Sequence, residues 1–121
     1  MAIGKARLLI CEDDIPTLAL LQKTFELAGC EVETATTGTV ALYKLRANHY
    51  DLVVMDYHMP LKDAQDTMNE LSKEGGKNTT PKILISAEDR SADAATLGFE
   101  AFYPKPITPD LAEAIIKTHV R

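Results

Sequence analysis

The stretch Asp51-Leu-Val-Val-Met-Asp56, followed by Tyr57-His-Met-Pro60, runs through four apolar residues into a carboxylate at the start of a loop. A continuous apolar run of this length, bounded by loop residues, is typical of a strand that is buried on both faces of a sheet. A second run, 8–11, ends in the acidic stretch 12–14. The two strand ends therefore place several carboxylates together, and these repel one another unless a cation joins them.

Short apolar runs alternate with longer segments of helical period along the whole chain. We expect strands at about 8–11, 31–35, 52–55, 82–86 and 101–103, and helices at about 14–28, 37–48, 63–73, 91–97 and from 108 onward. This alternation is the signature of βα units around a parallel sheet, and five units predict a doubly wound α/β fold. The second strand alternates in polarity and the fifth runs into two prolines, which predicts that both are edge strands.

The helices carry apolar stripes that are expected to face the sheet. The inward residues are predicted to be Leu18, Leu21, Phe25 and Ala28, then Val40, Leu42 and Leu45, and in the last helix Leu111, Ile115 and Ile116. Asp14 and Thr108 stand where N-caps are expected. His49, His58 and His119 show no pattern of zinc ligands, so we expect them at the solvated surface.

Length and charge set limits on the class of protein. The 121 residues suit one domain, 1–121, without a linker. Thirteen Lys and Arg against eighteen Asp and Glu leave a net charge of −5, which argues against direct nucleic-acid binding. The apolar runs are too short to span a membrane, so we expect a cytoplasmic protein. Cys11 and Cys30 lack a CxxC spacing and are expected to be reduced.

In a doubly wound sheet the functional crevice lies outside the carboxyl ends of the strands. The first strand end supplies Glu12 and Asp13, the third Asp56, the fourth Ser86 and the fifth Lys105. Carboxylates are ligands that Mg²⁺ prefers, while a hydroxyl and an ammonium neutralise a transferring phosphoryl group. The set predicts phosphoryl transfer in which Asp56 is both metal ligand and nucleophile.

These motifs resemble the receiver domain of two-component response regulators over nearly the whole chain. LLICEDD resembles the acidic pair of the first strand, VVMDYHMP the phosphoacceptor segment, ILISA the fourth strand and FYPKP the end of the fifth. The resemblance implies a flavodoxin-like, five-stranded sheet of order 2-1-3-4-5 with helices on both faces. It also implies a cis bond between Lys105 and Pro106.

The resemblance assigns roles to individual residues. Asp56 is the implied phosphoacceptor, with Ser86 and Lys105 as its catalytic partners. Glu12, Asp13, Asp56 and the backbone carbonyl of His58 are the implied ligands of Mg²⁺, with Mn²⁺ as the alternative ion. Ser86 and Phe102 are the implied switch residues. Three positions depart from the family pattern, because Ala64 stands for a common glycine, Phe102 for a frequent tyrosine, and Pro104 precedes the lysine.

The implied partners are proteins. A histidine kinase or histidine phosphotransfer protein is expected to supply the phosphoryl group, and a downstream protein to bind the face formed by the fourth helix, fifth strand and fifth helix. A phosphorylation-dependent homodimer stays open, as does the choice between a single-domain regulator and a receiver excised from a longer hybrid kinase or regulator. The domain is expected to catalyse only its own phosphotransfer and dephosphorylation, and so not to be an enzyme in the usual sense.

Two other functions compete with this interpretation. A pseudo-receiver would keep the fold as a binding module without control by phosphate, but the complete set of acids, hydroxyl and lysine argues against it. A Mg²⁺-dependent phosphohydrolase would normally carry an acid two residues after the nucleophile and a cap domain. Position 58 is His and no insertion could form a cap, so this class is disfavoured.

Overall fold

The computed structural model describes residues 5–59, 63–74 and 79–120. The five strands are β1 (Arg7–Cys11), β2 (Glu31–Ala35), β3 (Leu52–Asp56), β4 (Lys82–Ser86) and β5 (Ala101–Pro104). The five helices are α1 (Ile15–Leu27), α2 (Gly38–Ala47), α3 (Ala64–Lys73), α4 (Ser91–Leu97) and α5 (Pro109–His119). The predicted alternation is confirmed, and its bounds are correct to within about two residues.

All strands are parallel and form one sheet in the order β2-β1-β3-β4-β5, as the resemblance implied. β3 and β4 lie inside the sheet and every residue of each is buried. β2 and β5 are the edges, which confirms the prediction made from the polar alternation of one and the prolines of the other.

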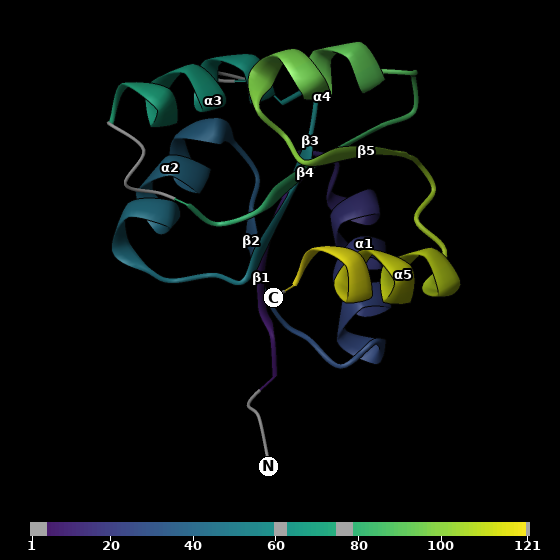
Figure 1. The fold of residues 1–121 in the computed structure, drawn as a ribbon. Coiled ribbons are helices and arrows are strands. Elements are labelled where there is room, and N and C mark those ends of the chain that lie inside the picture. The colour runs from purple at the N-terminus through teal and green to yellow at the C-terminus, as the bar shows by residue number, and fades with distance from the viewer. Residues whose placement is uncertain (1–4, 60–62, 75–78, 121) are drawn as a thin grey trace.

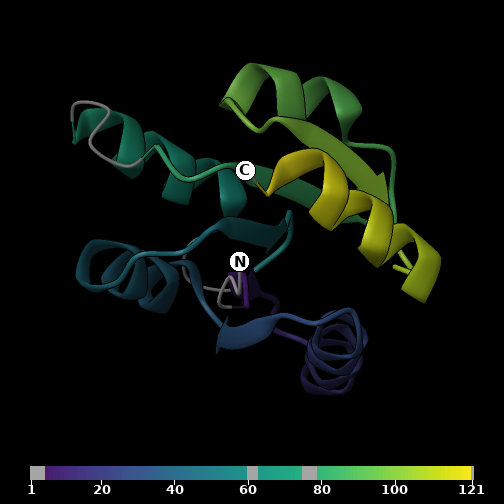
Figure 2. The ribbon, with the colours of Figure 1, turned by 60° about the horizontal axis from the view of Figure 1, so that its bottom comes forward.

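Helices cover both faces of the sheet (Figures 1 and 2). The helices α2, α3 and α4 pack on one face against alternate strand residues such as Leu9, Val53 and Leu84. The helices α1 and α5 pack on the other face, against the residues in between, such as Ile10 and Val54. Because successive side chains of a strand point to opposite faces, one apolar run builds both layers of core.

Side-chain caps fix where the helices begin. Asp14 accepts a hydrogen bond from the Thr17 amide at 3.1 Å, and Thr108 accepts one from the Leu111 amide at 3.2 Å, as predicted for both residues. These bonds satisfy amides that have no partner within the helix. Gly29, at φ +98°, ends α1 in a conformation that other residues rarely adopt.

Three packing predictions require correction. Val40 is 38% exposed, because it lies on the outer side of α2 while Ala41 and Leu42 are buried. In α1 the buried set contains Thr24, and Ala28 is only partly buried. In α5 the predicted inward residues are confirmed, since Ile115 is buried and the partly buried Leu111 and Ile116 pack against the core, but the buried stripe also contains Ala112 and His119. His119 is therefore a core residue and not the surface residue that was predicted.

Within the described residues, none of the helices combines the length and the apolar character that a crossing of a lipid bilayer requires. Cys11 and Cys30 are both buried and free.

The central strands should dominate stability. We expect Leu84→Ala, which empties a fully buried position in β4, to lower the free energy of unfolding by about 2–5 kcal/mol. The matched control Leu27→Ala removes the same atoms from a side chain that is 73% exposed and should change it by less than about 0.5 kcal/mol. Urea unfolding measures both, and equal losses would contradict this account of the core.

Candidate functional site

Three carboxylates converge at the C-terminal edge of the sheet. Asp56 is the last residue of β3, while Glu12 and Asp13 follow the end of β1. Cys11 of β1 stands in register with Met55 of β3, so the acids that follow lie side by side. One carboxylate oxygen from each of Glu12, Asp13 and Asp56 lies within 4.8 Å of the other two. Glu12 and Asp56 are buried and Asp13 is exposed.

Lys105 reaches this cluster from the end of β5. Its Nζ lies 2.5 Å from Oε1 of Glu12 and 2.9 Å from Oδ1 of Asp56. Its backbone amide donates a hydrogen bond to the carbonyl of Ser86 at 2.9 Å. The peptide bond from Lys105 to Pro106 is cis, as the resemblance implied. The ends of β1 and β3 thus meet at the Lys105 ammonium, and the end of β4 is bonded to the Lys105 backbone.

Burial and mutual charge perturb the pKa values of Glu12, Asp56 and Lys105. Burial raises the pKa of Asp56, and the hydrogen bond and charge of Lys105 offset only part of this. Burial also raises the pKa of Glu12, with the Asp56 charge acting in the same direction. Burial alone would lower the pKa of Lys105, but its bonds to Glu12 and Asp56 together outweigh burial and raise that pKa. Holding both carboxylates ionised is therefore costly even with the Lys105 ammonium in contact with each.

The donor set fits a divalent cation that prefers oxygen. When ionised, the three carboxylates exceed the one ammonium by two negative charges. All three offer hard oxygen atoms on one side of the sheet edge, which suits Mg²⁺ or Mn²⁺ better than a soft metal. The exposed position of Asp13 leaves that side open to water, which Mg²⁺ usually retains as part of its shell.

Ser86 and Phe102, predicted as switch residues, lie on neighbouring strands. Ser86 is the buried last residue of β4, and its Oγ accepts a hydrogen bond from the Glu88 amide at 3.2 Å. Phe102, on β5, is partly buried and packs against the apolar cluster under α2, α3 and α4. Ser86 thus lies on the strand next to that of Asp56, and Phe102 lies one strand further on.

A cluster of charged and aromatic side chains bridges the loops that follow β3 and β4. His58 Nε2 lies 3.1 Å from Oε1 of Glu88. Arg90 places its guanidinium 4.2 Å from the ring centre of Tyr57, and its Nη2 lies 3.3 Å from Oε2 of Glu88. Sequence reasoning missed Arg90, because no local pattern indicates that it stacks on a residue 33 positions away.

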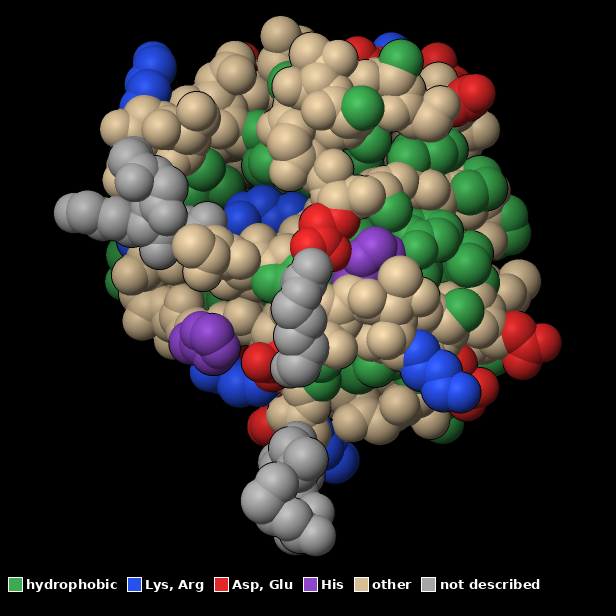
Figure 3. Space-filling view, in the orientation of Figure 1, with side chains coloured by type: hydrophobic (Ala, Val, Ile, Leu, Met, Phe, Trp, Pro, Cys, Tyr) green, Lys and Arg blue, Asp and Glu red, His purple; other side chains and the backbone are tan. Residues whose placement is uncertain are grey.

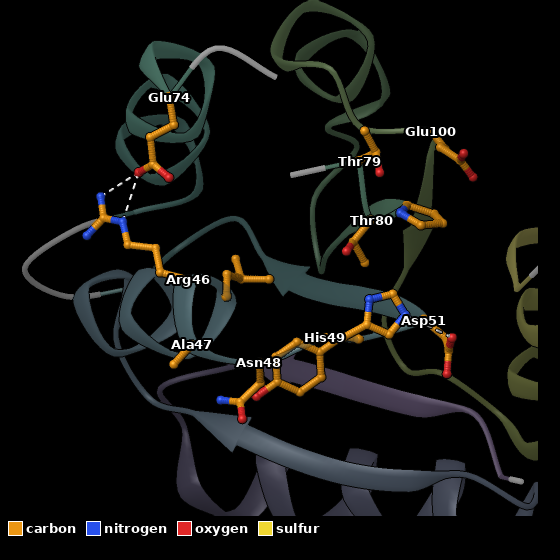
Figure 4. Close-up of a pocket in the computed structure, with 12 residues that line it drawn as sticks. Arg46, Ala47, Asn48, His49, Asp51, Glu74, Thr79, Thr80 and Glu100 are labelled. Atoms are coloured by element: carbon orange, nitrogen blue, oxygen red, sulfur yellow. Dashed lines mark hydrogen bonds and ion pairs between the residues drawn. The ribbon is translucent and has the colours of Figure 1, made fainter. Parts of the chain in front are cut away.

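Two hollows lie at opposite ends of the strands. One of about 340 Å³ is lined largely by apolar groups and adjoins Lys105, between α1 and the segment that leads into α5. The other, of about 860 Å³, opens at the N-terminal edge of the sheet (Figure 4). There Arg46 binds Glu74 at 2.9 and 2.6 Å through its Nε and Nη2. This larger hollow lies at the opposite end of the strands from the acids, so it takes no part in the predicted chemistry.

The fold and the site together define a class: a doubly wound α/β domain with an acid and lysine centre at the carboxyl ends of its strands. The family model of the response regulator receiver domain matches residues 8–117. The chain belongs to this family, the receiver domains of two-component signalling. As a class, receiver domains interact with histidine kinases and downstream effectors and are not enzymes in the usual sense.

Individual relatives agree with this assignment. The chain is 34% identical over 119 residues to a CpxR homologue, a transcriptional regulatory protein of Haemophilus influenzae. This match covers 96% of this chain and 51% of that protein. The chain spans about half the length of curated regulators such as this one.

Solved structures show the same fold. A receiver domain of the Francisella response regulator 1452 superposes with a TM-score of 0.86 at 25% identity, covering 96% of this chain and 97% of that one. The response regulator TrrA of Thermotoga maritima, solved in complex with Mg²⁺ and BeF, superposes with a TM-score of 0.82 at 26% identity. The match covers 93% of this chain and 97% of that one.

The raised pKa of Asp56 has a consequence for stability. A folded-state pKa above the unfolded one means that the folded chain holds its proton longer, so stability is lost as pH rises through the folded pKa. In the presence of a chelator, we expect the unfolding free energy of the wild type, relative to Asp56→Asn, to fall as the pH rises above about 3.9, the ordinary pKa of an Asp carboxyl. Urea unfolding across this range measures the difference, and a constant difference would contradict the shift.

A divalent cation should reverse this loss. Mg²⁺ at about 100 times its Kd should stabilise the wild type by about 2.7 kcal/mol, because an ion held only by the folded site favours folding. Asp56→Asn and Asp13→Asn should show a smaller gain, since each removes one carboxylate. Thermal unfolding with and without Mg²⁺ tests this, and equal gains in all three chains would place the ion elsewhere.

Proposed function

We propose that this receiver accepts a phosphoryl group on Asp56 from the phosphohistidine of a histidine kinase or a histidine phosphotransfer protein. Glu12, Asp13, Asp56 and the backbone carbonyl of His58 would hold Mg²⁺, or Mn²⁺ as the alternative. The observation that carries this proposal is the contact of Lys105 with both Glu12 and Asp56, beside three carboxylates within 4.8 Å of one another.

The chemistry follows from the positions of the side chains. An oxygen of Asp56 forms a bond to phosphorus while the bond from phosphorus to the donor nitrogen breaks, and the imidazole takes up a proton as it leaves. Lys105, 2.9 Å from Oδ1 of Asp56, stands where an ammonium neutralises a phosphoryl oxygen. A bound Mg²⁺ would supply further neutralisation of the negative charge at the site.

Ser86 would be the second contact of the new group. Phosphorylation adds about −2 charge and strong acceptor oxygens. The Ser86 hydroxyl, which now accepts a bond from the Glu88 amide, would turn toward these oxygens as a donor. Its movement would open space for Phe102, two strands from Asp56. Inverting a 1:99 population would need about 5.5 kcal/mol, so we expect a partial shift.

Two surfaces fit the proposed partners. The apolar hollow beside Lys105 is lined by Leu20, a residue of α1 that is 62% exposed, and suits the docking of a phosphodonor near Asp56. On the face shown in Figure 3, hydrophobic side chains gather between α4 and α5, along β5. The partly buried Leu97, Phe102 and Leu111 belong to these elements. A downstream protein would bind there.

The remaining expectations follow from this function. Residues 1–121 would act as one receiver domain, in the cytoplasm, where histidine kinases hold their phosphoryl groups. The domain would catalyse only its own phosphotransfer and dephosphorylation, with no turnover of a separate substrate. A homodimer formed through the same face is the alternative to a distinct output protein. The pseudo-receiver remains the competing function, and the next experiment separates the two.

Intact-mass spectrometry after incubation with acetyl phosphate and Mg²⁺ tests the proposal. We expect the wild type to gain one phosphoryl group, and Asp56→Asn or a chelated sample to gain none. Asp51→Asn is the matched control, since Asp51 flanks the other end of β3 and its amide oxygen would still accept from the Arg7 amide. No gain by the wild type would favour the pseudo-receiver, and repeated turnover of acetyl phosphate at a high rate would favour a phosphohydrolase.

Lys105 offers a second test of the same chemistry. Lys105→Met keeps most of the side-chain length but removes the ammonium, so we expect phosphoryl uptake to slow by about 100-fold. Lys117→Met, an exposed lysine on α5, is the matched control and should leave the rate unchanged. The rate of mass gain measures both, and an unchanged rate in Lys105→Met would remove this residue from the site.

A further inference from the structure

His119 occupies a core position but makes polar bonds. It belongs to the buried stripe of α5 with Ala112 and Ile115, and it is 5% exposed. Its Nε2 lies 2.7 Å from the hydroxyl of Tyr103, and its Nδ1 lies 2.8 Å from Oε2 of Glu100. The rings of Tyr103 and His119 also meet edge to face, with centroids 5.7 Å apart. Both ring nitrogens are therefore occupied.

The protonation pattern follows from these partners. An ionised carboxylate only accepts hydrogen bonds, so Nδ1 of His119 is the donor to Glu100. In the neutral imidazole, Nε2 then accepts a bond from the Tyr103 hydroxyl, whereas in the imidazolium it donates to that oxygen. The donor and acceptor groups of Tyr103, His119 and Glu100 can therefore form both hydrogen bonds with either the neutral or the charged imidazole.

These two hydrogen bonds tie the last turn of α5 to β5 at two points. Tyr103 lies within β5, and Glu100 directly precedes that strand. Glu100 is itself held in place, because its amide donates a hydrogen bond to the carbonyl of Lys82 at 2.8 Å. Hydrogen bonds weaken steeply when they are misaligned, whereas apolar contacts tolerate small shifts. A displacement of β5 would therefore misalign the hydrogen bonds that hold the last turn of α5.

β5 is in turn tied to the proposed phosphorylation site. Ser86 stands in register with Pro104, and the Lys105 amide donates to the Ser86 carbonyl. Phe102 and Tyr103 are successive residues, and they pack on opposite faces of the sheet. Phe102 has no polar group with which to report its position, but its neighbour has a hydroxyl that is bonded to α5.

We propose that the hydrogen-bonded chain Tyr103–His119–Glu100 transmits a change of β5, produced when Asp56 is loaded, to the C-terminal turn of α5. The inference rests on the proposed function, since it needs loading of Asp56. The movement of Phe102 would then act through packing on the α4 side of the sheet and through hydrogen bonding on the α5 side.

Hydrogen exchange and the imidazole NMR signals of His119 test the proposal, with the full chain free and loaded with beryllofluoride and Mg²⁺. In the wild type, loading should shift the His119 signals and change exchange at amides 117–120 by about twofold or more. In Tyr103→Phe, these amides should exchange about three to ten times faster before loading, because one hydrogen bond is lost. Loading should then change them no further.

The controls separate this link from general packing. Tyr43→Phe removes a hydroxyl from a tyrosine on α2 that is 72% exposed, and it should respond as the wild type does. Glu100→Gln keeps an oxygen that accepts from Nδ1 and should retain the response, whereas Glu100→Ala should lose it. An equal response in Tyr103→Phe and the wild type would overturn the proposal.

Loading is followed separately by intact mass after treatment with acetyl phosphate. A wild type that gains the phosphoryl group but shows no change at His119 or at amides 117–120 overturns the proposed link and leaves the proposed function standing. A wild type that gains no phosphoryl group overturns the proposed function, and the link that rests on it falls as well. The two failures are therefore distinguishable.

Discussion

The ammonium of Lys105 is the group on which the arrangement of the site depends. It contacts Glu12 and Asp56, two buried carboxylates that would otherwise repel each other at the adjacent ends of β1 and β3. The lysine comes from a strand that is two places away from β3 in the sheet. Its ion pairs therefore exist only when the sheet is complete, and they join the first and last strands of the chain into one charged centre.

This centre carries more negative than positive charge when its carboxylates are ionised. Burial raises the pKa of Glu12 and of Asp56, and one lysine offsets only part of the effect. The excess of negative charge favours binding of a divalent cation, and it also makes the centre sensitive to any change in charge. A phosphoryl group on Asp56 would redistribute the contacts of Lys105 and Ser86, which both belong to the end of the sheet nearest β5. The site and the edge strand are therefore physically coupled.

Much of this could be predicted from local patterns. The continuous apolar run at β3 indicated a buried central strand, because only a strand covered on both faces lacks polar residues. Asp14 and Thr108 were recognisable as caps from their positions before helical segments. Asp56, Glu12 and Asp13 were recognisable because each follows an apolar run. In a parallel sheet the ends of such runs meet at one edge, so sequence order translated directly into proximity.

Other features had no local signal. His119 was expected at the surface, since a histidine near the end of a helix usually lies there, and only the approach of Tyr103 and Glu100 makes its burial favourable. Val40 was expected to pack, but α2 is turned so that Ala41 and Leu42 face the sheet. Arg90 was not noticed, because its partner Tyr57 lies on another loop.

The sequence by itself determined the order of the elements, the central strands and the acids at their ends, because each follows from the period and polarity of neighbouring residues. Only the tertiary structure decided the polar contacts away from the strand ends that were predicted to converge: Arg90 with Tyr57, and His119 with Tyr103 and Glu100. The physical reason is that the energy of a polar contact depends on distances of a few ångströms between residues remote in the chain, whereas burial of an apolar face depends mainly on the pattern of the segment itself.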